Sequence, residues 1–168
     1  DALRSAVNGF IDSVAAKSAD SQIAIVKFAG DKRDIVGNDT YREDGYTYNY
    51  SQIVKNLTTV DATGADALKT AVNALRAAGA TAADYGMQHA QTIITGAANN
   101  GRQKVVVMFT DGEPNHNNGF SNSVANAAIS ASKAMKNNGN GATVYTIGCF
   151  SGTPGSNVTN YMNYVSSN

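Results

Sequence analysis

Apolar and polar positions alternate along this chain with two different periods, and together they predict its helices and strands. Apolar residues recur at helical spacing in five segments, near 3–14, 61–76, 84–95, 121–135 and 158–165. Short apolar runs bounded by turn residues predict strands at 22–29, 104–110 and 142–147. Asp44-Gly45, flanked by alternating tyrosines, predicts a hairpin within 40–50. Strands and helices therefore alternate, which predicts an α/β fold, a three-layer sandwich around a doubly wound, mostly parallel sheet.

The strand predicted at 104–110 carries candidate chemistry at its carboxyl end. Five consecutive apolar residues predict that this strand is buried on both faces, and Asp111-Gly112 then turns the chain. In open α/β sheets, ligands bind at the carboxyl ends of the strands. Asp111 is therefore a candidate binding carboxylate, and making a turn or capping a helix is its alternative role.

Composition and charge narrow the class of protein. A chain of 168 residues that is 42% apolar suits one domain, and we take 1–168 as that domain. Thirteen basic and thirteen acidic residues cancel, which argues against capture of nucleic acid or of an anionic membrane. No apolar run approaches the roughly 20 residues of a membrane span. The single cysteine, Cys149, lies in a strand-like run and is expected to be a buried small hydrophobe, with a reactive thiol as the alternative.

Enzyme motifs are missing from the sequence. It has no GxGxxG or GxxxxGK[ST] loop for phosphates and no GxSxG nucleophile motif. Only two histidines are present, His89 in a predicted helix and His116 in the loop after Asp111. For His116 we favour a solvated loop position over a minor role at the site. We therefore expect no enzyme, and an α/β enzyme is the lesser alternative.

Two segments together carry a resemblance to a known family. Gly79-Ala80-Thr81 with Gly86 opens a predicted helix, and Phe109-Thr-Asp-Gly112 follows a predicted strand. In this order they resemble the von Willebrand factor A domain. More narrowly, 79–90 and 144–152 are similar to the A domains of Gram-positive pilus tip adhesins, and the likeness covers nearly the whole chain.

The resemblance implies a metal-ion-dependent adhesion site on top of the sheet. Thr81 and Asp111 match two of the family's three metal-binding segments, and an acidic group of the bound ligand completes the shell of a Mg²⁺, Mn²⁺ or Ca²⁺ ion. Asp84 and Glu113 are near-site candidates, although we favour a salt bridge or a helix cap for each.

The function implied by the resemblance is adhesion at a bacterial surface. The expected partners are a host protein or glycan with an acidic group and other pilus subunits, without nucleic acid and without membrane insertion. The expected location is extracellular, on a pilus or anchored to the cell wall, with export and anchoring signals outside these residues. A structural pilin domain with a degenerate metal site is the alternative.

The sequence departs from the family pattern in one respect. The family's first strand and its D-x-S-x-S motif are expected before the helix at 3–14, and this sequence has neither. We expect a first-strand segment from elsewhere to insert between 22–29 and 104–110 and to bring Asp and Ser ligands beside Thr81 and Asp111. Without it, we expect these 168 residues to bind Mg²⁺ weakly, because one carboxylate and one hydroxyl chelate poorly.

Overall fold

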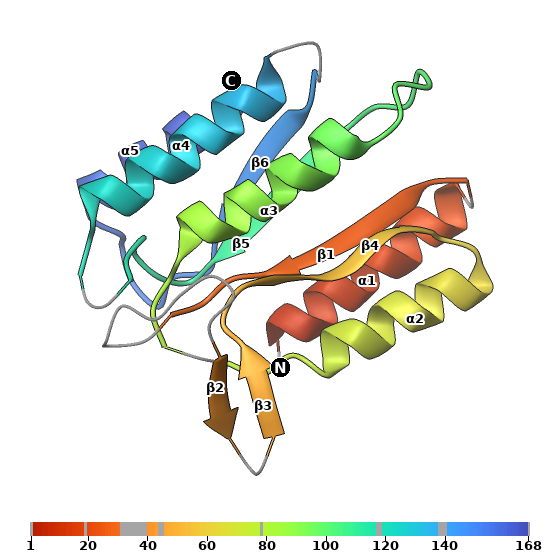
Figure 1. The fold of residues 1–168 in the computed structure, drawn as a ribbon, viewed down its shortest axis with the longest axis horizontal. Helices are drawn as coiled ribbons and strands as arrows, with labels where there is room; N and C mark the ends of the chain where they lie inside the picture. Colours follow the sequence, from red (N-terminus) through yellow and green to blue (C-terminus); the bar gives the residue numbers. More distant parts are fainter. Residues whose placement is uncertain are drawn as a thin grey trace. The chain divides into compact units, whose positions relative to one another are not determined.

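The computed structural model describes residues 2–18, 20–30, 40–43, 46–77, 79–116, 119–137 and 141–167. Within these ranges helices and strands alternate along most of the chain, as Figure 1 shows. The helices are α1 (Ala2–Lys17), α2 (Ala62–Asn73), α3 (Ala83–Gly96), α4 (Asn122–Lys136) and α5 (Ser156–Val165). The strands are β1 (Gln22–Lys27), β2 (Thr40–Glu43), β3 (Tyr46–Asn49), β4 (Gln52–Thr59), β5 (Val105–Thr110) and β6 (Thr143–Gly148).

The predicted α/β fold class is confirmed, and the predicted helices form where apolar spacing placed them. The predicted hairpin also forms. β2 and β3 pair antiparallel with Glu43 opposite Tyr46, while the turn residues Asp44 and Gly45 lie outside the described ranges. β5 and β6 pair in parallel, from Val105 opposite Thr143 to Thr110 opposite Gly148. The carboxyl ends of these two strands therefore lie side by side.

Strand β4 was not predicted from the sequence, whose patterns indicated only the hairpin within 40–50 and then the helix at 61–76. β4 hydrogen-bonds to β1 and runs back along it in the opposite direction (Figure 1). The sequence Gln52–Thr59 contains a signal for a strand in its β-branched residues Ile53, Val54, Thr58 and Thr59. Asn56 and Lys55 interrupt that signal, since both residue types are depleted in strands.

Contacts divide the chain into two compact units, and each has its own apolar core. The first unit comprises Asp1–Lys27 and Ile53–Ala77. In it, buried residues of α1 and α2 share one cluster with the partly buried Ile23 and Ile25 of β1. Asp61 caps α2 by accepting a hydrogen bond from Gly64 N at 2.8 Å. The buried members of this cluster are Ile11, Val60, Ala65, Leu68 and Val72.

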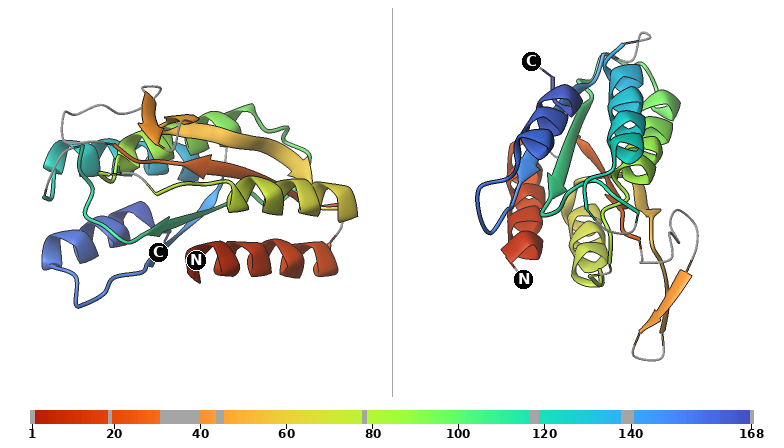
Figure 2. Two further views of the ribbon diagram at one scale, coloured as in Figure 1. Left: turned by 90° about the horizontal axis from the view of Figure 1, so that it is seen from below. Right: turned by 90° about the vertical axis from the view of Figure 1, so that its left-hand side faces the viewer.

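The second unit comprises Phe28–Gln52 and Ala78–Asn168. Helices α3 and α4 lie side by side in it (Figures 1 and 2) and share a core with β5, β6 and α5. Met108 of β5 and Val144 of β6 lie in this core, as do Met87 of α3 and Met135 of α4. These residues hold the β5–β6 pair against the helices and so fix the end of β5 from which the candidate site is built.

The expectation that the strand at 104–110 is buried on both faces was wrong. Met108 and Thr110 are buried, but Val105 is 50% exposed, and Tyr145 and Ile147 on the same face of β6 are also exposed. Within the described ranges β5 pairs only with β6. The helices of this unit pack against the face that carries Met108 and Val144. On the other face of β5, Val107 and Phe109 are partly buried.

None of the helices that the structure describes has both the length and the apolar character needed to cross a membrane.

Candidate functional site

Asp111 is presented by a tight turn at the carboxyl end of β5. The preceding residue, Thr110, is buried, and its hydroxyl donates to Gly112 O at 3.1 Å and accepts from Gly112 N at 3.3 Å. Cys149, which follows β6, donates its backbone N–H to Thr110 O at 2.8 Å. These bonds anchor the turn from two sides and leave Asp111 exposed to solvent. Its carboxylate is therefore available to a ligand, as the sequence analysis expected.

Thr81 lies in the short segment that leads into α3, and its backbone is fixed on both sides. The preceding residue, Ala80, donates its N–H to Gly30 O at 2.7 Å. Thr81 O accepts from Ala83 N at 2.8 Å and from Asn115 N at 2.9 Å. The second of these bonds joins the Thr81 segment to the loop that follows Asp111, although the two are about thirty residues apart in sequence.

The side chain of Thr81 faces the turn that carries Asp111. A Cβ atom added to Gly112 would lie 2.5 Å from Thr81 Oγ1, closer than such atoms approach in proteins. Gly112 therefore allows the Thr81 hydroxyl to lie directly against the backbone next to Asp111. The structure thus brings together the two residues that the sequence analysis paired from separate segments.

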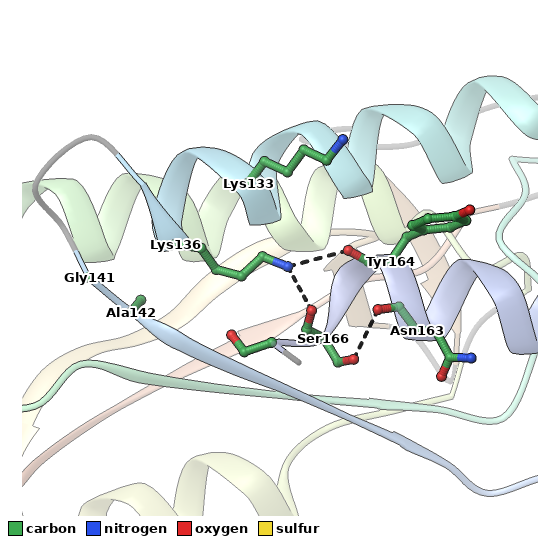
Figure 3. Close-up of a pocket in the computed structure, with 8 residues that line it drawn as sticks. Lys133, Lys136, Gly141, Ala142, Asn163, Tyr164 and Ser166 are labelled. Carbon is green, nitrogen blue, oxygen red and sulfur yellow. Dashed lines mark hydrogen bonds between the residues drawn. The ribbon is translucent and has the colours of Figure 1, made fainter.

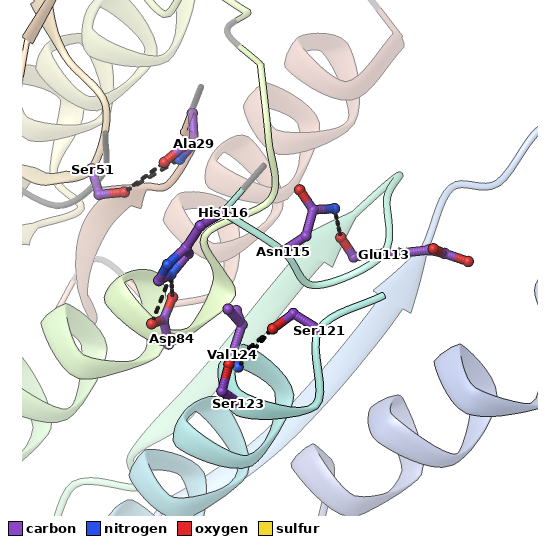
Figure 4. Close-up of polar contacts among 9 residues, drawn as sticks. All are labelled: Ala29, Ser51, Asp84, Glu113, Asn115, His116, Ser121, Ser123 and Val124. Atoms are coloured by element: carbon purple, nitrogen blue, oxygen red, sulfur yellow. Dashed lines mark hydrogen bonds and ion pairs between the residues drawn. The ribbon is translucent and has the colours of Figure 1, made fainter. Parts of the chain in front are cut away.

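Asp84 is brought close to the same loop but already has a partner. It lies in the first turn of α3, and His116 Nε2 donates to its Oδ1 and Oδ2, both at 2.9 Å (Figure 4). This is the ion-pair role that we favoured for Asp84. Glu113 is exposed, and Figure 4 shows its side chain pointing away from this pair. Its carbonyl oxygen accepts a hydrogen bond from Asn115 Nδ2 at 2.6 Å.

Two expectations about single residues were wrong. His116 was expected in a solvated loop, but its side chain is only 22% exposed and binds Asp84. Cys149 was expected to be buried, but it is exposed and lies just after β6, which ends at Gly148. The partnership of His116 with Asp84 spans 32 residues, and no spacing pattern in the sequence indicates it.

The residues present fit a hard divalent cation as a partial set of ligands. Such cations take carboxylate, hydroxyl, carbonyl and water oxygens, and Thr81 and Asp111 supply one hydroxyl and one carboxylate. Within the described ranges, no group of three or more His, Cys, Asp or Glu side chains gathers into a metal-binding cluster. Among the described residues the site therefore offers one carboxylate and one hydroxyl, and water or an incoming acidic group would supply the other ligands.

A polar pocket of about 430 Å³ lies at the opposite end of β6, where the strand begins (Figure 3). Lys136 extends into this region and donates to the carbonyl oxygens of Tyr164, Val165 and Ser166 at 3.3, 3.1 and 2.7 Å. Its ammonium group thereby caps the carboxyl end of α5. Burial lowers the pKa of Lys136, and the neighbouring Lys133 charge lowers it further. We interpret this pocket as the junction of two helix ends and place the candidate site at Thr81 and Asp111.

Comparisons with known proteins identify relatives of the chain. The family model described as the von Willebrand factor type A domain matches residues 1–168. Two solved structures of the pilus adhesin SpaC from Lactobacillus rhamnosus GG, one of them in an open conformation, are similar in fold, with TM-scores of 0.66 and 0.67. Each shares 16% sequence identity with this chain and is matched over 98% of it. The chain spans 24% of the length of those adhesin chains. No curated protein sequence matches it.

Proposed function

This chain belongs to the von Willebrand factor type A domain family, and from that premise we propose that it is a ligand-binding module of an adhesive bacterial surface protein. The fold that it shares with a pilus adhesin supports this proposal. In the proposed setting the protein is extracellular, on a pilus or anchored to the cell wall. Its partners are a host protein or glycan and neighbouring pilus subunits.

We propose that the module binds its ligand through a divalent cation, Mg²⁺ or alternatively Mn²⁺ or Ca²⁺. The observation that carries this proposal is the position of Thr81 Oγ1, 2.5 Å from where a Cβ atom added to Gly112 would lie, beside the exposed Asp111. When bound, the cation supplies a positive centre for an oxygen ligand. Thr81 and Asp111 would hold it, and an acidic group of the partner would add the charge that the protein does not provide.

The second edge of β5 is proposed to accept a further strand. Within the described ranges β5 pairs only with β6, and Val105 at its start is half exposed although apolar. A strand added there would satisfy backbone groups that otherwise lack hydrogen-bond partners in the sheet. If that strand carries Asp and Ser residues at its carboxyl end, it would also add ligands beside Thr81 and Asp111.

Removal of the cation tests the proposed function. In the intact protein, calorimetric titration is expected to detect Mg²⁺ binding, and EDTA is expected to abolish attachment of cells that display the protein. Excess Mg²⁺ should restore attachment. Attachment that persists in EDTA would contradict the cation mechanism. Absence of both attachment and measurable Mg²⁺ binding would indicate the structural pilin domain, and turnover of a small substrate would indicate an enzyme.

Replacing Gly112 with alanine is expected to weaken Mg²⁺ binding by about tenfold, which corresponds to about 1.4 kcal/mol. The new methyl group would displace Thr81 Oγ1, while the rest of the turn has room for it. The free energy of unfolding should change by less than about 1 kcal/mol, because a single hydroxyl can rotate away. Calorimetry and urea unfolding measure the two quantities.

The matched control for this substitution is Gly96→Ala. Gly96 ends α3 in the same unit, and a Cβ atom there meets nothing within 4 Å. Its Mg²⁺ affinity should equal that of the unaltered protein. Equal affinity in Gly112→Ala as well would contradict the assignment of the Thr81 hydroxyl to the site.

A further inference from the structure

The loop that follows Asp111 is tied to the beginning of α3 by contacts on both sides of Thr81. Asn115 N donates to Thr81 O at 2.9 Å, and His116 Nε2 donates to both carboxylate oxygens of Asp84 at 2.9 Å. Asp84 lies one turn beyond Thr81 along the chain. The loop therefore has a backbone attachment to the candidate ligand residue and a side-chain attachment just past it, as Figure 4 shows for His116.

The side-chain attachment is largely buried on the Asp84 side. Asp84 is 7% exposed, and burial of a carboxylate without a partner is strongly unfavourable, so the hydrogen bonds from His116 favour this arrangement of the loop. The ring of Tyr85 lies 5.6 Å from the His116 ring, at an angle of 47°. The imidazole is thus held between two consecutive residues of α3. Because a carboxylate accepts only, the Nε2 atom that faces Asp84 carries the proton.

Asp84 is poorly placed to act as a direct metal ligand, because both of its oxygens accept hydrogen bonds from His116. The negative charge of Asp84 also affects the pKa of a buried residue in the core of the unit, Tyr161. Burial raises the pKa of the Tyr161 phenol, and the Asp84 carboxylate raises it further. Asp84 is therefore a buried residue that holds the loop of the candidate site through His116, and it is not one of the exposed candidate ligands.

We propose that Asp84 and His116 are positioning residues that hold the Asp111 loop against Thr81, so that the carboxylate and the hydroxyl are presented together. This inference rests on the proposed function, because it assigns the pair a role in cation binding. Some residues orient metal ligands without binding the metal themselves. Replacing such a residue typically lowers metal affinity about 10- to 100-fold. The same loop also contains Asn115, whose buried Oδ1 atom has no hydrogen-bond partner among the described residues.

The test compares the Mg²⁺ affinity of variants of the intact protein. The affinity is measured by calorimetry, under conditions in which each variant is fully folded. His116→Ala is expected to raise the dissociation constant 10- to 100-fold. His116→Gln keeps a side-chain N–H that can reach Asp84 and should restore affinity to within about threefold. The Asp84→Ala, His116→Ala double variant leaves no buried charge unpaired, so it folds even if His116→Ala does not, and it should bind as weakly as the single variant.

The matched control is His89→Gln, which changes the other histidine of the chain on the same helix as Asp84. Its Mg²⁺ affinity should not change. Variants that lose stability in urea but keep the affinity of the unaltered protein would show a merely structural pair and overturn this inference alone. Absence of Mg²⁺ binding by the unaltered protein would overturn the proposed function, and this inference with it.

Discussion

Replacing Thr81 and Asp111 together with alanine in the intact protein is expected to abolish Mg²⁺ binding and cation-dependent attachment. Asp111 offers the exposed carboxylate at the end of β5, and Thr81 offers the hydroxyl that lies against Gly112. The described residues form no other cluster of metal-binding side chains, so water would take the place of both ligands. The expected loss is at least a hundredfold in affinity, larger than for residues that only orient the ligands.

Single conservative substitutions separate the two contributions. Asp111→Asn keeps an oxygen but removes the charge, so it should lose most of the affinity. Thr81→Ser keeps the hydroxyl and should lose little. Asp66→Ala is the matched control, since it removes a carboxylate that is 80% exposed and forms an ion pair with Lys69 at 3.3 Å on α2. Attachment that is unchanged in the double variant would rule out the metal mechanism.

Gly64→Ala is expected to lower the free energy of unfolding by about 3 kcal/mol, a large share of the 5–15 kcal/mol of a typical domain. A Cβ atom at Gly64 would overlap the backbone oxygen of Thr59 and lie 3.2 Å from a side-chain carbon of Thr58. The first of these is main chain at the end of β4, which cannot rotate away. Relief would require α2 to move from β4 and would disturb the buried Leu68 and Val72 of the same helix.

The control for this prediction is the other helical glycine of the first unit. Gly9 lies in the middle of α1, and a Cβ atom there meets nothing within 4 Å. Gly9→Ala should stabilise the protein by about 0.5–1 kcal/mol, because glycine loses more conformational freedom in a helix than alanine. Urea unfolding of both variants measures the contrast. A Gly64→Ala protein as stable as the unaltered one would show that α2 does not lie this close to β4.

Local sequence patterns predicted the helices and the hairpin correctly, because there the environment of a residue depends on its neighbours in sequence. The spacing of Leu3, Val7 and Ile11 predicted α1, because a helix that covers a core must present one apolar face. Asp44-Gly45 predicted the β2–β3 hairpin, because a two-residue turn joins strands that are adjacent in sequence. The same logic failed at β4, where polar residues in a partly exposed strand hid the pattern.

Only one of the two residues of the candidate site, Asp111, was predicted from the sequence pattern itself. The run Val105–Thr110 followed by Asp111-Gly112 placed a carboxylate at the end of a strand, and this position needs no knowledge of the rest of the chain. Thr81 was paired with it through family resemblance. The structural reason for that pairing, the close approach of Thr81 to Gly112, became visible only when both loops were placed in space.

The sequence by itself therefore determined the α/β class, the helices and the strand end that presents Asp111. Only the tertiary structure decided that His116 binds Asp84, that Cys149 is exposed and that Val105 of β5 is half exposed. The physical reason is that periodicity reports which side of an element faces apolar neighbours. It does not report which residue, dozens of positions away, the fold brings within hydrogen-bonding distance.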